Sequence, residues 1–342
     1  MNSSGTGSKL APPVAPPANP LPWRTRLAVS VVSALSDLGR RHDGTVNRRL
    51  LSFLDLKCPA STTPIQSVVS SDVTVDASRN LWFRVYAPAT SAAAAGGGGL
   101  PVLVFFHGGG FAFLSAASVG YDLVCRRFAR SLPAIVVSVN YRLTPEHRFP
   151  CQYDDGFDVL RFLDGDAGAL PENADIGKCF LAGDSAGANI AHHVAVRAGG
   201  SGFRRLRVLG QVSIQPFFGG EERSESEIRF RSNSVLVSLD RTDWLWKAFL
   251  PDGSTRDHHA ANVTGSDISG KEYPETVVIV GGLDPLQDWQ RRYYEWLKRS
   301  GKEATLVEYP NMIHAFYMFP ELPESAEVFA QVRDFVARKS AG

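Results

Sequence analysis

Cysteine is scarce in this chain of 342 residues, and its few occurrences stand far apart. The four cysteines are Cys58, Cys125, Cys151 and Cys179, and no two of them form a CxxC pair. This spacing excludes the disulfide framework of a small secreted domain and argues against a metal site. We therefore expect reduced, partly buried thiols.

Long hydrophobic runs and an excess of charge of one sign are also missing. The apolar stretch 27–35 is too short to span a bilayer and is interrupted by serines. Residues 1–20 are rich in serine and proline and lack the apolar core of a signal peptide, so we expect a disordered tail and a cytoplasmic protein, with the nucleus as a second compartment. The formal net charge of +1 gives no reason to expect a nucleic-acid or membrane-surface partner.

What the chain does have, from residue 69 to 342, is an alternation of strand and helix patterns. Strand patterns fall at 73–76, 81–88, 102–108, 134–141, 179–183, 208–214, 276–282 and 304–309. Helical patterns fall at 121–131, 152–163, 186–198, 286–299 and 323–338. The later strands are continuously apolar, as strands buried on both faces are. We predict one α/β domain with an eight-stranded, mostly parallel sheet, helices on both faces, and the first two strands as an antiparallel edge hairpin.

Two further segments accompany this domain. Residues 21–68 repeat apolar side chains at helical spacing, which predicts two amphipathic helices ahead of the sheet. Residues 217–260 form an insertion between two core strands and include the apolar stretch "TDWLWKAFL". The run "AAAAGGGG" at 92–99 predicts a flexible connection between strands.

The stretch "LAGDSAGANIAHH" places a serine at a sharp turn between a strand and a helix. Residues 183–187 fit the pattern G-x-S-x-G, in which the turn exposes the hydroxyl of Ser185 beyond the end of the strand. The flanking glycines avoid a collision with the neighbouring strand or helix. The free N–H of Ala186, at the start of the helix, suits a negative charge that forms on a substrate oxygen. The pattern indicates a nucleophilic serine.

A serine hydroxyl needs a base, and the chain offers eight histidines. We predict that the base is His314, which follows the last strand and so reaches the same edge of the sheet as Ser185. Packing, loop or glycine-loop roles are expected for the other seven, His42, His107, His147, His192, His193, His258 and His259. His192 and His193, for example, lie about two helical turns from the serine, roughly 10–12 Å away.

The base in turn needs a carboxylate acceptor, and the segment after residue 282 supplies two. Asp284 directly follows a strand, whereas Asp288 begins the next helix and is better explained as a cap or helix-dipole partner. We predict that Asp284 orients His314. The order Ser185, Asp284, His314 is that of α/β-hydrolases, not of chymotrypsin or subtilisin.

The segment "FFHGGGFAF" (105–113) leaves a buried strand with three successive glycines. Their backbone N–H groups are unobstructed, so we predict that Gly108, Gly109 and Ala186 form an oxyanion hole. A phosphate-binding loop is the rival interpretation, but the chain has no G-x-x-x-x-G-K-[ST] motif.

The motifs "HGGGF" and "GDSAGAN", with the placement of Asp284 and His314, resemble the hormone-sensitive-lipase group of α/β-hydrolases. The segments "DGTVNRRLLSFLD", "SVNYRLTPEHRFP" and "GLDPLQDWQ" are similar to its plant carboxylesterase branch, which contains the gibberellin receptors. The resemblance spans nearly all of residues 22–338. It implies an α/β-hydrolase fold, an oxyanion hole at the His-Gly-Gly segment, and a lid formed by the N-terminal helices over the pocket.

Three positions bear on the choice within that branch. The receptors resemble this chain but lack the triad histidine that His314 supplies here, and they carry a hormone-binding serine where this chain has Gly110. Ala188 replaces a glycine common in the group, a small change that should only tighten helix packing. The differences at His314 and Gly110 favour a carboxylesterase; the alternative is a gibberellin-receptor-like binding protein with little or no hydrolysis.

The expected substrate is a small-molecule ester. Apolar side chains of the insertion favour short-chain or aromatic esters, and Gly110, Phe217 and Tyr317 are candidate substrate-binding residues. Acyl transfer by a serine, a histidine and an aspartate requires neither a metal nor a cofactor.

Overall fold

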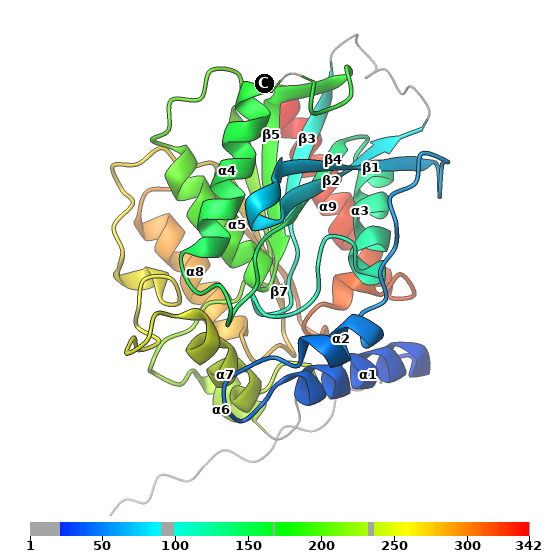
Figure 1. Cartoon of the computed structure of the whole chain (residues 1–342). Coiled ribbons are helices and arrows are strands. Elements are labelled where there is room, and N and C mark those ends of the chain that lie inside the picture. Colours follow the sequence, from blue (N-terminus) through cyan, green and yellow to red (C-terminus); the bar gives the residue numbers. More distant parts are fainter. Residues whose placement is uncertain (1–20, 90–98, 167, 232–235, 342) are drawn as a thin grey trace, which may run out of the picture.

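The computed structural model describes residues 21–89, 99–166, 168–231 and 236–341 (Figure 1). The expected disordered tail, and all but the last residue of the expected connection 92–99, lie outside these residues.

One eight-stranded sheet forms the centre of the molecule, in the order β1-β2-β4-β3-β5-β6-β7-β8. The strands are β1 (Val68–Asp76), β2 (Leu81–Pro88), β3 (Leu100–Phe106), β4 (Ile135–Asn140), β5 (Ala174–Asp184), β6 (Val208–Ile214), β7 (Glu275–Gly281) and β8 (Ala304–Tyr309). β1 and β2 form the predicted antiparallel hairpin, joined by the short 3₁₀ helix η1 (Ala77–Arg79), and β2 is also antiparallel to β4. Every other pairing is parallel, which confirms the predicted sheet.

Helices cover both faces of the sheet, as predicted. α4 (Cys151–Gly165) and α5 (Ala186–Ala198) pack against the core cluster that contains Val104 and Leu181. α3 (Val119–Ser131) and α9 (Pro323–Ser340) pack on the opposite face, against Phe105 and Phe180. α8 (Gln287–Arg299) covers Val278 and Val280. Successive residues of one strand thus enter different cores, because strand side chains alternate between faces.

The segment before the sheet forms two helices, α1 (Trp23–Gly39) and α2 (Arg48–Leu54), as predicted. Their packing face differs from a simple amphipathic pattern. Leu27 is 58% exposed and Phe53 is 80% exposed, whereas the small residues Thr25 and Ser33 are buried. Polar contacts explain the choice of face, because Thr25 donates a hydrogen bond to Glu321.

The insertion between β6 and β7 contains two helices that the sequence analysis did not identify, α6 (Glu225–Arg229) and α7 (Leu239–Phe249). They lie beside α1 and α2 at one end of the sheet (Figure 1). Several polar contacts join the segments directly; for example, the Trp244 Nε1–H donates to the carbonyl of Arg41, and Arg241 pairs with Asp37.

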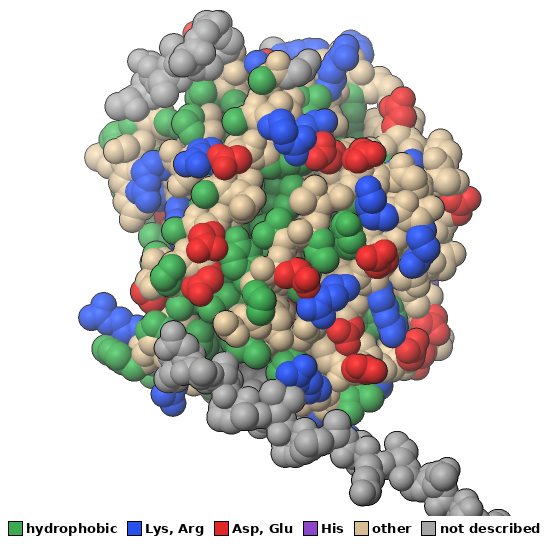
Figure 2. Space-filling model, turned by 180° about the vertical axis from the view of Figure 1, so that it is seen from behind, with side chains coloured by type: hydrophobic (Ala, Val, Ile, Leu, Met, Phe, Trp, Pro, Cys, Tyr) green, Lys and Arg blue, Asp and Glu red, His purple; other side chains and the backbone are tan. Residues whose placement is uncertain are grey.

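Acidic and basic side chains are interspersed over the face seen in Figure 2, and neither sign gathers into one area there. Within the described residues, no helix has both the length and the apolarity that crossing a bilayer demands.

Candidate active site

Ser185 occupies a strained turn between β5 and α5, as the G-x-S-x-G pattern predicts. Its backbone has φ 53° and ψ −120°, a left-handed conformation that is rare outside glycine. Two backbone hydrogen bonds fix the turn: Ser185 N–H donates to the Ile214 carbonyl at 2.9 Å, and Phe217 N–H donates to the Ser185 carbonyl at 2.9 Å. The Ser185 side chain lines a cavity and makes no hydrogen bond within the described part of the chain.

The glycines around Ser185 are sterically required. A Cβ at Gly187 would lie 1.9 Å from the Phe106 carbonyl oxygen, and one at Gly183 would lie 2.4 Å from the Gly187 carbonyl carbon. Both neighbours are backbone atoms and cannot move aside. The turn at Ser185 therefore depends on close contact between β5, α5 and β3.

His314 lines the same cavity as Ser185 and contacts Asp284. The His314 Nδ1 and the Asp284 Oδ2 lie 2.6 Å apart, and both side chains are buried. Asp284 accepts three further hydrogen bonds, from the Leu286 N–H at 2.9 Å, the Gln290 amide at 2.8 Å and the Gln215 amide at 3.1 Å. Because the carboxylate is so fully engaged, it holds the His314 ring in one orientation.

The charge state of His314 follows from this pairing. Burial alone opposes a charged imidazole, but the charge and hydrogen bond of Asp284 outweigh it, and the more distant Asp184 adds to the effect. The net result is a raised pKa for His314. An imidazole with this environment accepts a proton readily, which is what a general base requires.

The rival carboxylate, Asp288, does not contact His314. It lies in the first turn of α8, and its Oδ2 accepts a hydrogen bond from the Ser226 N–H at 2.7 Å. Two of the other histidines are also engaged elsewhere. Burial lowers the pKa of both His107 and His192 to about 3, and the His107 ring stacks on Tyr141 with centroids 4.2 Å apart.

The structure of the glycine loop (residues 107–110) differs from the sequence prediction at Gly108. The N–H of Gly108 donates to the Tyr121 hydroxyl at 2.7 Å, so this group is not available to a substrate. Gly109 and Gly110, by contrast, line the cavity, with φ values of 95° and 61°. No hydrogen bond within the described residues uses their N–H groups. A Cβ at position 108 would lie 2.6 Å from the Asp184 Oδ2 and 2.8 Å from the Tyr121 hydroxyl oxygen, so the close approach of these groups favours glycine there.

Asp184 directly precedes Ser185 and lies against the glycine loop at Gly108. The Tyr121 hydroxyl donates to its Oδ2 at 3.0 Å, and its Oδ1 has no hydrogen-bond partner among the described residues. Burial raises the pKa of Asp184 to about 6, although Tyr121 and the charge of His314 act in the opposite direction. Tyr121 therefore connects the glycine loop to the turn that carries Ser185.

The cavity has a volume of about 560 Å³ and a mainly apolar lining. Ser185 and His314 share it with side chains of the N-terminal helices, the insertion and the glycine loop, among them Leu35, Leu51, Phe113, Phe217, Leu245, Leu286 and Met318. The predicted contact residues Gly110 and Phe217 are part of this lining. Tyr317 is not part of the lining and lies buried near Asp184.

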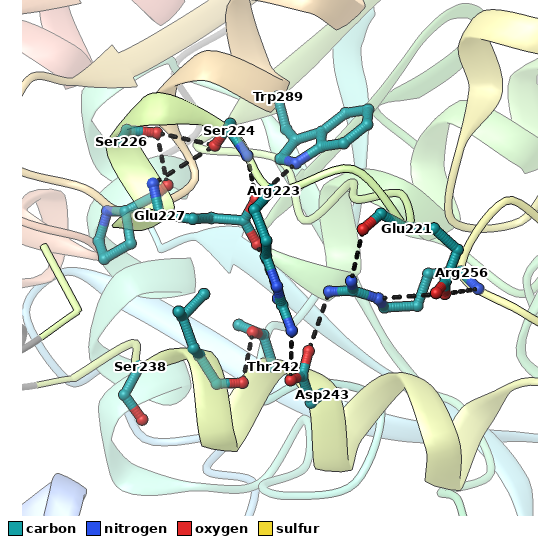
Figure 3. Close-up of polar contacts among 12 residues, drawn as sticks. Glu221, Arg223, Ser224, Ser226, Glu227, Ser238, Thr242, Asp243, Arg256 and Trp289 are labelled. Carbon is teal, nitrogen blue, oxygen red and sulfur yellow. Dashed lines mark hydrogen bonds and ion pairs between the residues drawn. The ribbon is translucent and has the colours of Figure 1, made fainter. Parts of the chain in front are cut away.

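Polar contacts fix the insertion over α8 (Figure 3). Ser224 and Glu227 form a capping box at the start of α6, and Glu227 also accepts from the Trp289 Nε1–H at 3.0 Å. The Ser226 hydroxyl donates to the Pro285 carbonyl at 2.7 Å, one residue from Asp284. A chain of ion pairs continues outward through Arg223, Asp243, Arg256 and Glu221. The insertion thereby supports the loop that carries the carboxylate.

Comparison with known proteins places this geometry in a family. A family model described as the alpha/beta hydrolase fold matches residues 103–318, and a carboxylesterase family model matches residues 55–145. The chain belongs to the α/β-hydrolase family. The predicted fold and the resemblance to the plant carboxylesterase branch are thus confirmed.

The relatives of this α/β-hydrolase include both receptors and esterases. The gibberellin receptor GID1C of Arabidopsis thaliana is 42% identical over 328 residues, covering 92% of this chain and 94% of that protein. Carboxylesterase 20 of the same plant is 38% identical over 276 residues, covering 77% and 83%. An esterase of Pyrobaculum calidifontis has a similar structure, with a TM-score of 0.71, 27% identity and coverage of 94% and 92%. The chain is therefore an esterase-like α/β-hydrolase.

Proposed function

We propose that this chain is a serine carboxylesterase. Ser185 is the nucleophile, His314 the general base and then the general acid, and Asp284 the carboxylate that orients the imidazole. The oxyanion hole consists of the N–H groups of Gly109, Gly110 and Ala186, with Gly110 taking the place first assigned to Gly108. Ala186 contributes because it opens α5, where a first-turn N–H has no partner within the helix.

The reaction runs in two steps. Ser185 Oγ attacks the ester carbonyl carbon while His314 Nε2 takes the hydroxyl proton, and the electron pair of the carbonyl moves onto its oxygen. Collapse of this tetrahedral species breaks the bond to the alcohol, which leaves with the proton from His314. Water then attacks the acyl carbonyl carbon while His314 takes its proton. Collapse of this second tetrahedral species breaks the bond to Ser185 Oγ, which regains a proton from His314 as the carboxylic acid is released.

The observation that carries this proposal is the 2.6 Å contact between Asp284 and His314, which lines the same cavity as Ser185. A buried carboxylate that bonds Nδ1 leaves Nε2 as the proton acceptor. The esterase names among the relatives give independent support.

The lining of the cavity favours uncharged esters. Its volume of about 560 Å³ and its apolar side chains suit short-chain or aromatic acyl and alcohol groups. In this proposal residues 21–68 form a lid and residues 217–260 a cap, over a catalytic domain of residues 69–342.

The test is hydrolysis of p-nitrophenyl butyrate by the purified protein and by Ser185→Ala. We expect release of p-nitrophenol by the wild type and a loss of about 10⁶-fold in kcat for the variant. Equal rates for the two proteins would exclude Ser185 as the nucleophile.

A second candidate function is binding of a gibberellin without turnover. It is favoured by the receptors among the relatives and by the exposed apolar side chains of α1 and α2, since such patches mark interaction surfaces. Calorimetry with a gibberellin separates the two functions. Tight binding by a protein that releases no p-nitrophenol would replace the esterase proposal.

A further inference from the structure

We infer that Gln215 is a positioning residue that sets His314 and Asp284 against each other, an inference that rests on the proposed function. Gln215 lies outside the proposed triad and outside the glycine loop. It connects the two loops that carry the histidine and the carboxylate.

The placement of Gln215 is unusual. It directly follows β6, between the strand that leads to Ser185 and the strand that leads to Asp284. Its backbone has φ 45°, its N–H donates to the Ile279 carbonyl at 2.8 Å, and its side chain is 1% exposed. A long polar side chain in a left-handed conformation, with no access to water, requires protein partners for every polar atom.

Each polar atom of the Gln215 amide has such a partner. Nε2 donates to the Asp284 Oδ2 and to the Ile313 carbonyl, both at 3.1 Å. Oε1 accepts from the Ala315 N–H at 2.7 Å. The amide therefore bonds the backbone on both sides of His314, at Ile313 and Ala315. Its nitrogen also donates to the Asp284 carboxylate, which His314 contacts.

Only a glutamine satisfies these partners with neutral groups. A glutamate would supply the acceptor for Ala315 but would bring a second carboxylate against Asp284. A methionine would leave the Ala315 N–H and the Ile313 carbonyl without this partner and would remove one of the donors to Asp284. Ala315 itself is in the left-handed region with φ 60°, so its orientation depends on the bond that Gln215 accepts. The amide thus fixes the backbone from which the imidazole projects.

Gln290 provides a matched comparison. Its Nε2 donates to the same Asp284 oxygen at 2.8 Å, from α8, but it has no contact with the backbone of residues 313–315. Its Oε1 has no hydrogen-bond partner among the described residues. If Gln215 acted through Asp284 alone, removal of either amide would have the same effect.

The first experiment compares Gln215→Met with Gln290→Met on p-nitrophenyl butyrate. We expect Gln215→Met to lower kcat by roughly tenfold to about 100-fold, since a small displacement of a catalytic group has effects of this order. KM should change little, because Gln215 does not line the cavity. Gln290→Met should retain a clearly higher kcat than Gln215→Met. Equal kcat values for the two variants, or a kcat of Gln215→Met equal to wild type, would overturn the inference.

The second experiment uses Gln215→Glu and the pH profile of kcat/KM. While the introduced carboxyl group is protonated, it can donate to Asp284 as the amide does, but two adjacent ionised carboxylates repel each other. Ionisation of the introduced carboxyl group should therefore raise the pKa of His314 and move the rising limb of kcat/KM to higher pH than in the wild type. A loss of packing alone lowers the profile without changing its shape, so a parallel profile would overturn the inference.

The failure of the proposed function is distinguishable from the failure of this inference. If the wild type releases no p-nitrophenol, the esterase proposal is rejected. The effect of Gln215 on His314 is then measured by NMR titration of His314, whose signal is assigned by comparison with His314→Gln. Ionisation of the new carboxylate in Gln215→Glu should raise the pKa of His314, because a nearby negative charge stabilises the imidazolium. An unchanged pKa in that variant rejects the role of Gln215.

Discussion

The carboxyl edge of the sheet and the N-terminal helices face each other across one cavity, but different interactions hold them. At the edge, buried backbone and amide groups converge on Asp284, which is inaccessible to solvent. In α1, Asp37 pairs with Arg241 at 2.6 Å while its own side chain remains 48% exposed. A carboxylate is thus held by buried hydrogen bonds at the sheet edge, in Asp284, and by a solvent-exposed ion pair in α1, in Asp37.

This difference predicts different responses to mutation and salt. Removing one partner of a buried polar group leaves the other unsatisfied, whereas exposed ion pairs contribute about 1 kcal/mol or less and are screened by salt. We therefore expect changes at the edge to alter the chemical step strongly and independently of salt. Changes at the helices should alter substrate entry weakly, and mainly at low ionic strength.

Among the variants that compare these two regions, Asp284→Asn should have the largest effect. It removes the charge that raises the pKa of His314 and disturbs the tautomer, so we expect kcat to fall by about 10³- to 10⁴-fold. In the wild type, kcat/KM should rise with pH through a pKa above 6.5, because only the neutral imidazole accepts the serine proton. In the variant, that rise should move to lower pH.

Asp288→Asn is the matched control for this variant. Asp288 lies four residues away, on the same segment, and its carboxylate contacts Ser226 instead of His314. Its pH profile should coincide with that of the wild type. A loss of kcat as large as that of Asp284→Asn would show that the segment, and not the carboxylate, is responsible.

Asp184→Asn tests the energetic cost of a buried carboxylate at the sheet edge, whose Oδ1 has no hydrogen-bond partner among the described residues. Because burial raises the folded-state pKa of Asp184 to about 6 from an ordinary 3.8, its ionisation costs stability as the pH rises through that interval. The variant should gain up to about 3 kcal/mol of unfolding free energy at pH 8 and less at pH 5. Urea unfolding at both pH values measures the gain, and a larger gain at pH 5 would contradict this account.

Tyr121→Phe should separate the glycine loop from the nucleophile turn. It leaves the Gly108 N–H and the Asp184 carboxylate without their shared partner, which costs about 1–3 kcal/mol for an unsatisfied buried group. We expect kcat to fall by about tenfold through displacement of the oxyanion loop. Steady-state kinetics and thermal unfolding measure the two effects, and an unchanged kcat would show that the loop needs no such support.

The smallest effect should come from Asp37→Asn in α1. Its pKa is lowered chiefly by the hydrogen bond from Arg241, against the effect of burial, yet the exposed carboxylate should contribute less than about 1 kcal/mol. We expect a modest increase in KM at low salt that disappears in about 1 M NaCl, where the Debye length is about 3 Å. A change in kcat that persists in high salt would remove the distinction between the two regions.

Much of this arrangement is predictable from the sequence, because local signals report it. The strand–turn–helix context identifies Ser185, and the ends of parallel strands place Asp284 and His314 at one edge. The orientation of a single N–H is not local, however. Gly108 and Gly110 are equivalent in the sequence, and only the Tyr121 hydroxyl, supplied by α3, decides which of them faces the cavity.

The buried face of α1 and the contacts of Gln215 could not be predicted from the sequence, because both depend on residues far away along the chain. The buried face of α1 combines Val29 with the small polar residues Thr25 and Ser33, and apolar spacing does not reveal its polar contacts with α7 and Glu321. Gln215 gave a weak signal, as a polar residue at the carboxyl end of an apolar strand. Its partners lie about 70 to 100 positions away along the chain, and no periodicity connects them.

Under the proposed mechanism, the reactivity of Ser185 is a measure of completed folding, because Ser185 and His314 lie far apart along the polypeptide. The serine turn needs β5, β6 and the tightly apposed carbonyl of Phe106, while the imidazole arrives only after β8 has joined the far side of the sheet. A fluorophosphonate that labels activated serines should consequently ignore nascent chains truncated before β8, and report the moment at which the last strand docks.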